Sequence, residues 1–459
     1  MYRNDTIAAV STPRGKGGVA LIRISGQNAL DIASRCFHTK NGKDIAVMPP
    51  RRAVYGDILC RGGYRDSGIA VYYKAPASFT GEDTVELTCH GGTLITKRVL
   101  ESVLACGARL AEAGEFSHRA LINGKLTLCG AEALSDLLSA STDAQLRLAS
   151  GNSRGKLDRE LEEIYSLIAD TLSSLYAKID FPDEDLADMD GAELLLSAEK
   201  ALARIEKLIR GYEGTAAVRN GVPAVICGLP NTGKSSLYNA LAGEELAIVT
   251  DEAGTTRDVL SSELAVNGVL LRLSDTAGVR ETDGKVESIG VKRALEAIEG
   301  AALILAVFDG SRPLTEEDKQ LAERAASCKG KTLCVLNKSD MPTCTDRQYL
   351  ADVFGEVIEI SAKNGQGIDS LKTSIEKLFI DEDIDLDGDI FLTGERQYGA
   401  ATAAKAYLEG AVNALREGLP PDCATTDMEA ALGALGELDG RAVNEEVVAR
   451  IFANFCVGK

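Results

Sequence analysis

Apolar residues recur at intervals of three and four positions along much of this chain, and the clearest run lies between residues 157 and 179. Its members are Leu157, Leu161, Ile164, Ile168, Leu172, Leu175 and Ile179. This spacing places them on one face of an α-helix, so it predicts a long amphipathic helix. Helical patterns are also predicted near the end of the chain, over residues 395–417, 427–438 and 445–455.

The first 120 residues show a different pattern. Short runs rich in β-branched and aromatic residues predict strands. These runs are GGVALIRIS, GIAVYYKA and DTVELTCHGG. One helix is predicted among them, over residues 93–106, so this part of the chain is expected to be an α+β domain.

From Val222 onwards, apolar runs typical of buried strands alternate with helical stretches. The runs are VPAVICG, LLRLSDTAG, ALILAVFDG, TLCVLNKSD and VIEISAK. This alternation predicts a Ras-like, doubly wound α/β domain with helices on both faces of its sheet. The acidic stretch DEDIDLDGD, residues 381–389, follows as an exposed connector.

The simplest arrangement of these parts is an α/β domain inserted into a helical domain. We therefore predict an N-terminal domain over residues 1–120 and the first half of a helical domain over 121–217. The inserted domain covers 218–380, and the second half of the helical domain covers 381–459. A chain of 459 residues accommodates roughly three domains of about 150 residues.

Composition favours a cytoplasmic protein. Hydrophobic residues make up 45% of the chain, yet no apolar run is long enough to span a bilayer, and the first residues do not resemble a secretory signal. The 11 cysteines are scattered without metal-ligand spacing, as expected of core residues in a reducing compartment. A net charge of −19 argues against a general nucleic-acid coat, although a local basic groove for RNA stays possible.

The stretch GLPNTGKSS, residues 228–236, fits the phosphate-loop pattern GxxxxGK[ST] between a predicted strand and a predicted helix. In that pattern, backbone N–H groups wrap the phosphates, Lys234 neutralises their charge and the Ser235 hydroxyl reaches Mg²⁺. The nucleotide-binding residues predicted here are Asn231, Thr232, Gly233, Lys234, Ser235 and Ser236.

Three more motifs follow predicted strands and point to GTP. The DTAG motif supplies a metal-directed carboxylate and a glycine N–H for the γ-phosphate. An aspartate in NKSD can accept from both N1 and N2 of guanine, a donor pair that adenine lacks. The residues are Asp275, Thr276, Ala277 and Gly278, then Asn337, Lys338 and Asp340, then Ser361, Ala362 and Lys363. The alternative is a set of strand-end loops with polar caps.

Two features distinguish this site from that of Ras. Val279 stands where Ras-like enzymes carry the glutamine that orients water, so Glu287 is the candidate for that role, unless it only faces solvent on a helix. Asn231 and the segment TDEAGTTRD, residues 250–258, could together hold a large monovalent cation that replaces an arginine finger.

Motifs along the whole chain resemble one family, the tRNA modification GTPases MnmE (TrmE). They are DTIAAVSTPRGKGGVALIRISG, SFTGEDTVELTCHGG, GEFSHRALINGKLTL, IDFPDEDL and the terminal FCVGK. The resemblance implies a homodimer formed through the N-terminal domain, which also binds a folate one-carbon carrier, 5-formyl- or methylene-tetrahydrofolate. It further implies that the partner protein MnmG, which uses FAD, joins in modifying carbon 5 of the wobble uridine of certain tRNAs.

The resemblance also assigns roles to individual residues. K⁺ is implied at Asn231, Thr250, Glu252 and Thr255, and Mg²⁺ at Ser235 and Thr256, with Glu287 as the catalytic glutamate. The GTP-binding switch segment comprises Thr250, Asp251, Glu252, Ala253, Gly254, Thr255 and Thr256. The folate contacts are Arg23, Glu86, Lys125 and Lys459, each of which would otherwise be an ordinary surface charge.

The terminal helix pattern could hold Cys456 beside the one-carbon pocket, where a thiolate acts as nucleophile or acid. The alternative is a cysteine that only packs. Two other functions remain open, namely a GTPase switch in ribosome assembly and a structural hub with a vestigial GTPase. The residues that imply a folate pocket argue against the first, and the intact Lys234, Ser235, Thr256 and Asp275 argue against the second.

Overall fold

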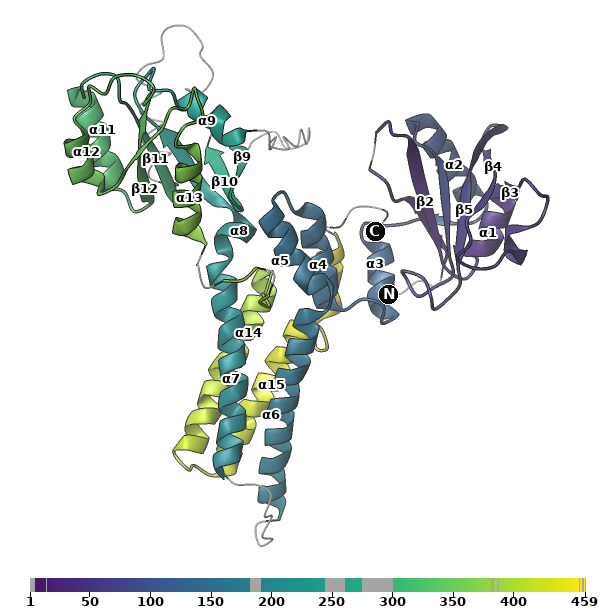
Figure 1. Ribbon diagram of the computed structural model, residues 1–459. Coiled ribbons are helices and arrows are strands. Elements are labelled where there is room, and N and C mark those ends of the chain that lie inside the picture. Colours follow the sequence, from purple (N-terminus) through teal and green to yellow (C-terminus); the bar gives the residue numbers. More distant parts are fainter. Residues whose placement is uncertain are drawn as a thin grey trace. The chain divides into compact units, whose positions relative to one another are not determined.

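The computed structural model describes residues 5–13, 15–181, 191–243, 261–274, 300–380, 384–386, 388–453, 455 and 458 (Figure 1). The chain separates into two compact units. The first comprises Met1–Ser135, Asn152–Leu202 and Gly399–Lys459, and the second comprises Asp136–Gly151 and Ala203–Tyr398.

The first unit contains a seven-stranded sheet with the strand order β3-β4-β5-β6-β2-β1-β7. Neighbouring strands are antiparallel, except for β1 and β7, which run parallel. The strands are β1 (Ile7–Val10), β2 (Val19–Ser25), β3 (Phe37–Thr39), β4 (Val54–Cys60), β5 (Tyr64–Tyr73), β6 (Thr84–His90) and β7 (Arg109–Leu110). The strands predicted from the β-type runs are confirmed.

The two faces of this sheet differ because successive side chains of a strand point to opposite sides. One face packs against α1 (Ala29–Cys36) and α2 (Thr93–Ala105) and buries Ile22, Ile24, Val85 and Leu87. The opposite face presents Arg23 and Glu86, which are paired across β2 and β6. On that face, Phe116 of α3 (Glu115–Ile122) packs against Ile7 and Ala9.

Helices form the rest of the first unit, and four of the described helices, α4, α5, α7 and α14, have residues in both units. The long helix α6 packs against α15 (Figure 1). Besides α1, α2 and α3, the described helices and helical turns that precede β8 or follow α13 are η1 (Ile45–Val47), α4 (Leu128–Ser139), α5 (Asp143–Ser153), α6 (Lys156–Asp180), α7 (Gly191–Gly214), α8 (Ala216–Asn220), α14 (Glu395–Arg416), α15 (Pro421–Asp439) and α16 (Glu445–Ala453).

The predicted helices are present, with shifted ends. Helix α15 begins six residues before the predicted start because Pro421 suits the first helical turn, where its missing N–H costs nothing. Burial along α6 follows the predicted face as far as Leu175. Ile179, which the same pattern places on that face, is 40% exposed, so the apolar period runs one turn further than the packing.

The second unit contains a six-stranded sheet with the order β13-β12-β11-β8-β10-β9. All neighbours are parallel except β9 and β10. The strands are β8 (Val222–Cys227), β9 (Ser261–Val266), β10 (Val269–Ser274), β11 (Leu303–Asp309), β12 (Lys331–Asn337) and β13 (Val357–Glu359). Since parallel strands share a direction, the carboxyl ends of β8, β11 and β12 meet at one edge.

Helices cover both faces of this sheet, as the predicted doubly wound fold requires (Figure 1). On one face lie α9 (Lys234–Ala242) and α13 (Ile368–Phe379), and on the other lie α11 (Glu316–Ala326) and α12 (Arg347–Phe354). None of the described helices combines the length and apolar character that crossing a bilayer requires.

A matched pair of substitutions in α6 tests the core. Ile164 is fully buried, and Ile164→Ala is expected to lower the free energy of unfolding by about 2–5 kcal/mol, because the lost methyl groups leave a cavity. Ile179→Ala, on the same helix but 40% exposed, is expected to change it by less than about 1 kcal/mol. Urea denaturation followed by circular dichroism measures both; equal effects would contradict the packing described.

Candidate functional site

The phosphate loop lies between β8 and α9, at the carboxyl edge of the six-stranded sheet. The Lys234 ammonium group turns back over this loop and donates to the carbonyl oxygens of Gly228 at 3.0 Å and Leu229 at 2.9 Å. Its burial lowers the pKa of Lys234, although Cys227 partly opposes that shift. A half-buried ammonium group whose partners among the described residues are neutral carbonyls suits an anion, because a phosphate would restore the pairing that burial removes.

The end of the loop leaves no room for a side chain. Gly233 has a φ of +96°, and a Cβ atom there would lie 2.1 Å from the Asn337 side-chain nitrogen. Only glycine combines that conformation with such a close approach. The predicted requirement for glycine at this position therefore has a specific cause, which is the side chain of Asn337 at the end of β12.

Asn337 joins two parts of the predicted nucleotide site. Its side-chain N–H group donates to the backbone oxygen of Thr232 at 2.9 Å, and its side-chain oxygen accepts from the N–H group of Ala362 at 3.0 Å. The side chain is almost fully buried, so both bonds are shielded from water. One amide therefore links the phosphate loop to residues 361–363, which we call the SAK segment.

Asp340 and Ser361 meet at the same edge. The Ser361 hydroxyl donates to Asp340 Oδ1 at 2.6 Å, and this bond is the main reason that the pKa of Asp340 lies below its usual range. Asp340 and Lys363 are exposed at the rim, whereas Ser361 is buried. An exposed, ionised carboxylate held by a buried hydroxyl is well placed to accept hydrogen bonds from a purine edge.

Lys338 forms an ion pair that sequence reasoning missed. Its Nζ lies 2.6 Å from Asp309 Oδ2, at the end of the neighbouring strand β11. Asp309 is almost fully buried and also accepts from the backbone and hydroxyl of Ser311. The sequence could have indicated a role for Asp309, because this residue ends the predicted strand in ALILAVFDG, as the residues of the other motifs follow theirs.

Several predicted site residues lie outside the described residues. They are Thr250, Asp251, Glu252, Ala253, Gly254, Thr255, Thr256, Asp275, Thr276, Ala277, Gly278, Glu287, Cys456 and Lys459. Of the proposed cation ligands, the structure describes Asn231, which is exposed and has a φ of +65°, and Ser235, which is half-buried. Ser236, also exposed, lies one residue further along α9.

A second site lies on the opposite face of the seven-stranded sheet from α1 and α2. Arg23 donates through Nε and Nη2 to the same oxygen of Glu86, at 3.0 and 2.8 Å. The rings of Phe79 and Phe116 lie 5.2 and 5.7 Å from the Arg23 guanidinium carbon. A carboxylate and a guanidinium flanked by two aromatic rings supply the groups that a flat polar heterocycle such as a pterin needs for binding.

Lys125 lies beside the segment that carries Phe79. Gly81 has a φ of +80°, and a Cβ atom there would approach the Lys125 side chain to 3.3 Å. Lys125 is exposed, whereas Arg23 is already engaged by Glu86. Lys125 is therefore more available than Arg23 to bind the carboxylated tail of a folate.

The described end of the chain is anchored to the seven-stranded sheet. The Ser11 hydroxyl, next after β1, donates to the carbonyl oxygen of Gly458 at 2.9 Å. Gly458 has a φ of +104°, and a Cβ atom there would lie 2.2 Å from the Val10 oxygen. Phe452 and Phe455 are buried beside Ala131 in the same unit. The expected docking of the terminal segment is thus present for its described residues.

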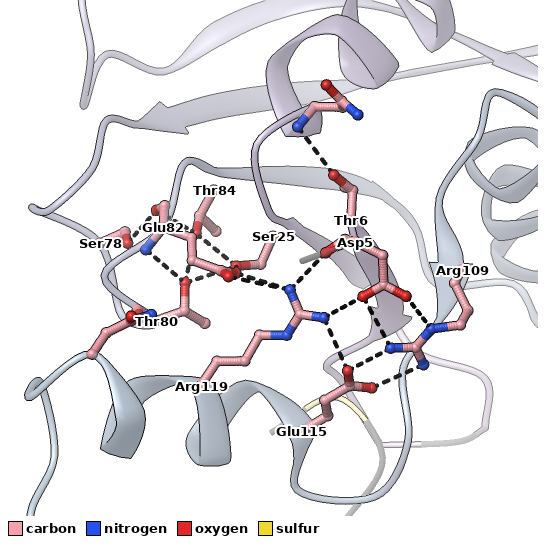
Figure 2. A network of polar contacts seen from close by, with 12 residues as sticks. Asp5, Thr6, Ser25, Ser78, Thr80, Glu82, Thr84, Arg109, Glu115 and Arg119 are labelled. Carbon is pink, nitrogen blue, oxygen red and sulfur yellow. Dashed lines mark hydrogen bonds and ion pairs between the residues drawn. The ribbon is translucent and has the colours of Figure 1, made fainter. Parts of the chain in front are cut away.

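Sequence reasoning also missed a polar network behind the second site (Figure 2). Arg119 and Arg109 share the carboxylates of Asp5 and Glu115, and Arg119 also pairs with Glu82. The motif GEFSHRALINGKLTL contains Glu115 and Arg119, but an arginine in a helix gives no sign that it will be buried, because its partners come from distant segments.

The doubly wound sheet and the phosphate loop tied to a purine-reading edge define a guanine-nucleotide-binding protein. A family profile described as the GTP-binding protein TrmE N-terminus matches residues 6–125, and one described as the MnmE helical domain matches residues 128–456. The chain belongs to the family of tRNA modification GTPases MnmE.

Full-length relatives support this assignment. The tRNA modification GTPase MnmE of Thermotoga sp. (strain RQ2) is 39% identical over 459 residues, covering 99% of this chain and 100% of that protein. The protein of the same name from Geobacillus kaustophilus (strain HTA426) is 40% identical over 465 residues, covering 100% of each. Among solved structures, Aquifex aeolicus Era bound to GDP and AlF4⁻ is 25% identical, covering 40% of this chain and 65% of that one, with a TM-score of 0.26.

Replacing the Asp340 carboxylate tests whether this residue recognises guanine. Asp340→Asn is expected to weaken GTP binding at least about tenfold and to improve binding of xanthosine triphosphate, because the amide can donate to the xanthine oxygen. Fluorescent-nucleotide titration measures both affinities. Asp369→Asn, an exposed aspartate of α13, is the matched control and should bind GTP normally. Unaltered guanine preference in Asp340→Asn would refute the assignment.

Proposed function

We propose that this protein is a potassium-activated GTPase that, with the FAD-dependent protein MnmG, modifies carbon 5 of the wobble uridine of certain tRNAs. The modification adds an aminomethyl or carboxymethylaminomethyl group and uses a folate one-carbon unit. The observation that carries the proposal is the Asn337 side chain, which holds the phosphate loop against the purine-reading edge in a chain of the MnmE family.

GTP hydrolysis is proposed to depend on holding the phosphates and the attacking water in place and on neutralising the phosphate charge. Lys234 and the loop backbone bind the phosphates, and Asp340 reads guanine. Mg²⁺, bound through Ser235 and Thr256, would supply positive charge at the phosphates, and K⁺, bound by Asn231, Thr250, Glu252 and Thr255, would supply the charge of an arginine finger. Glu287 is proposed to orient the attacking water, directly or through a second water.

The one-carbon carrier is proposed to bind at Arg23 and Glu86. The Glu86 carboxylate can accept from the 2-amino edge of a pterin while Arg23 holds it in place. Lys125 and Lys459 would pair with the carboxylated tail. Cys456 would then lie near the reactive carbon, as nucleophile or acid. The anchoring of Gly458 beside β1 supports this placement of the terminal segment.

A homodimer is proposed to form through the N-terminal part of the chain. Val19, Tyr55 and Ile69 are apolar yet 64%, 57% and 41% exposed. Ile69 is paired with Tyr55 on β4, so these two side chains lie on the same face of the sheet. Exposed apolar residues grouped on one face favour association. MnmG and tRNA are the further proposed partners, in the cytoplasm.

A GTPase switch in ribosome assembly is the alternative, and the pocket around Arg23 and Glu86 separates the two. Such a switch has no use for a site that combines aromatic walls, a carboxylate and a guanidinium. The functions also differ in outcome, because a cell that lacks an assembly factor keeps normal wobble uridines.

Hydrolysis is expected to depend on K⁺. Replacing K⁺ by Na⁺ at constant ionic strength should lower kcat at least about tenfold, equivalent to about 1.4 kcal/mol of barrier, because the smaller ion fits the proposed ligands poorly. Steady-state phosphate release in the two salts measures this. Rates that do not differ between K⁺ and Na⁺ would remove the cation from the mechanism.

The role of the terminal thiol can be tested in cells that lack the protein. Complementation with Cys456→Ser should restore GTP hydrolysis but leave most wobble uridines unmodified at carbon 5, as measured by mass spectrometry of digested tRNA. Cys423→Ser, which changes an exposed cysteine of α15, is the control and should restore modification. Full modification by Cys456→Ser would make the tail at most a lid, and normal tRNA in the cells without any complementation would favour the assembly-factor alternative.

A further inference from the structure

Arg119 is a buried cation at the junction of three chain segments (Figure 2). Its side chain is 2% exposed. Nη1 donates to the backbone oxygen of Asp5 at 2.7 Å and to both carboxylate oxygens of Glu82 at 3.2 Å. Nη2 donates to Asp5 Oδ1 at 2.7 Å and to Glu115 Oε1 at 3.0 Å. One guanidinium group therefore joins the start of the chain, the segment before β6 and helix α3.

The opposite charges in this cluster favour the ionised forms of Arg119 and Asp5. Burial by itself lowers the pKa of Arg119, but Glu82, Glu115 and Asp5 outweigh that effect and raise it. The Arg109 and Arg119 side chains in turn lower the pKa of Asp5 to about 2. Removing the Arg119 cation would leave the surrounding carboxylates with too little positive charge, which a largely buried site tolerates poorly.

Glu82 connects this charge cluster to the rest of its loop, residues 78–83, which precedes β6. Its second oxygen accepts from the Ser25 hydroxyl at 2.7 Å, and Ser25 lies 2.7 Å from the buried Thr80 hydroxyl. Asn123, in the turn after α3, donates to the Thr80 carbonyl oxygen at 2.7 Å. The loop is therefore anchored by the contacts of Glu82 with Arg119 and Ser25, and by the hydrogen bond from Asn123 to Thr80.

Residue Phe79 of this loop forms one aromatic wall of the pocket at Arg23. The other wall, Phe116, lies on α3, three residues before Arg119. Arg119 thus acts on both walls, through Glu82 on the loop and through its own helix. Asp5 extends the same connection to Ile7 of β1, which packs against Phe116.

We propose that Arg119 is a positioning residue that sets the spacing of the two aromatic walls around Arg23 and Glu86, and so determines the affinity for a flat pterin ring. Arg119 itself does not contact the ligand. This inference rests on the proposed binding of a folate one-carbon carrier at that pocket. The inference adds that a charge cluster, which does not contact the ligand, determines how well the pterin ring fits.

Binding of 5-formyltetrahydrofolate to the full-length protein, followed by isothermal titration calorimetry, tests the inference. Arg119→Met should weaken binding at least about tenfold, because the loop loses its anchor. Glu82→Gln, which keeps the shape but removes the charge, should weaken binding less. Arg35→Met, in an exposed ion pair with Asp31 in the same unit, is the matched control and should bind like the unmodified protein.

A tryptophan at the pocket wall reports on position separately from stability. The chain has no tryptophan, so Phe79→Trp introduces a single probe that keeps an aromatic ring over Arg23. Adding Arg119→Met should shift its emission to longer wavelength, since the loop moves towards water. A merely stabilising role for Arg119 would lower the unfolding temperature but leave the emission of the folded protein unchanged.

Far-ultraviolet circular dichroism serves as the check that Arg119→Met is folded, and GTP hydrolysis should be unaffected because the proposed nucleotide site lies in the other unit. Weaker folate binding with a red-shifted probe and normal hydrolysis supports the inference. Normal folate binding by folded Arg119→Met overturns the inference alone. Absence of folate binding in the unmodified protein overturns the proposed pocket, and with it the inference.

Discussion

The side-chain amide of Asn337 is the interaction on which the nucleotide site depends. It donates to the phosphate loop and accepts from the SAK segment, and it stands so close to Gly233 that a side chain there is impossible. Because the amide is buried at the end of a strand with neighbours on both sides, its position is set by the sheet. The loops of the proposed nucleotide site therefore depend on the register of β12 for their geometry.

In the first unit, ion pairs fix the segments around the proposed site. There Arg23 and Glu86, the residues of the proposed one-carbon site, lie on adjacent strands, and the strand register brings them together. The segments that surround them do not belong to the sheet and need another anchor. The Arg119 cluster supplies it, through short contacts to backbone and side chains from three parts of the chain. A fork-shaped guanidinium suits this task because its donors point in several directions in one plane.

The sequence predicted most of the elements and much less of their contacts. Apolar periodicity identified α6 and the buried strands, and the phosphate-loop glycines were recognised from their spacing. Periodicity did not show that Ile179 would be exposed, because it reports which residues share a face and not how far the neighbouring element extends. It also gave no sign that Asp309 would pair with Lys338, since the two residues are 29 positions apart.

The sequence by itself determined the class of this protein. Its motifs, in order and at the right strand ends, identify a GTPase with an additional N-terminal domain, because local chemistry and spacing are properties of the chain. The tertiary structure decided which charges are partners. Arg119 looks like an ordinary helical arginine in the sequence, yet the packing of Asp5, Glu82 and Glu115 around it makes it a buried centre. Pairing of that kind arises only when distant segments are folded together, since each ion is tolerable away from water only in the presence of the others.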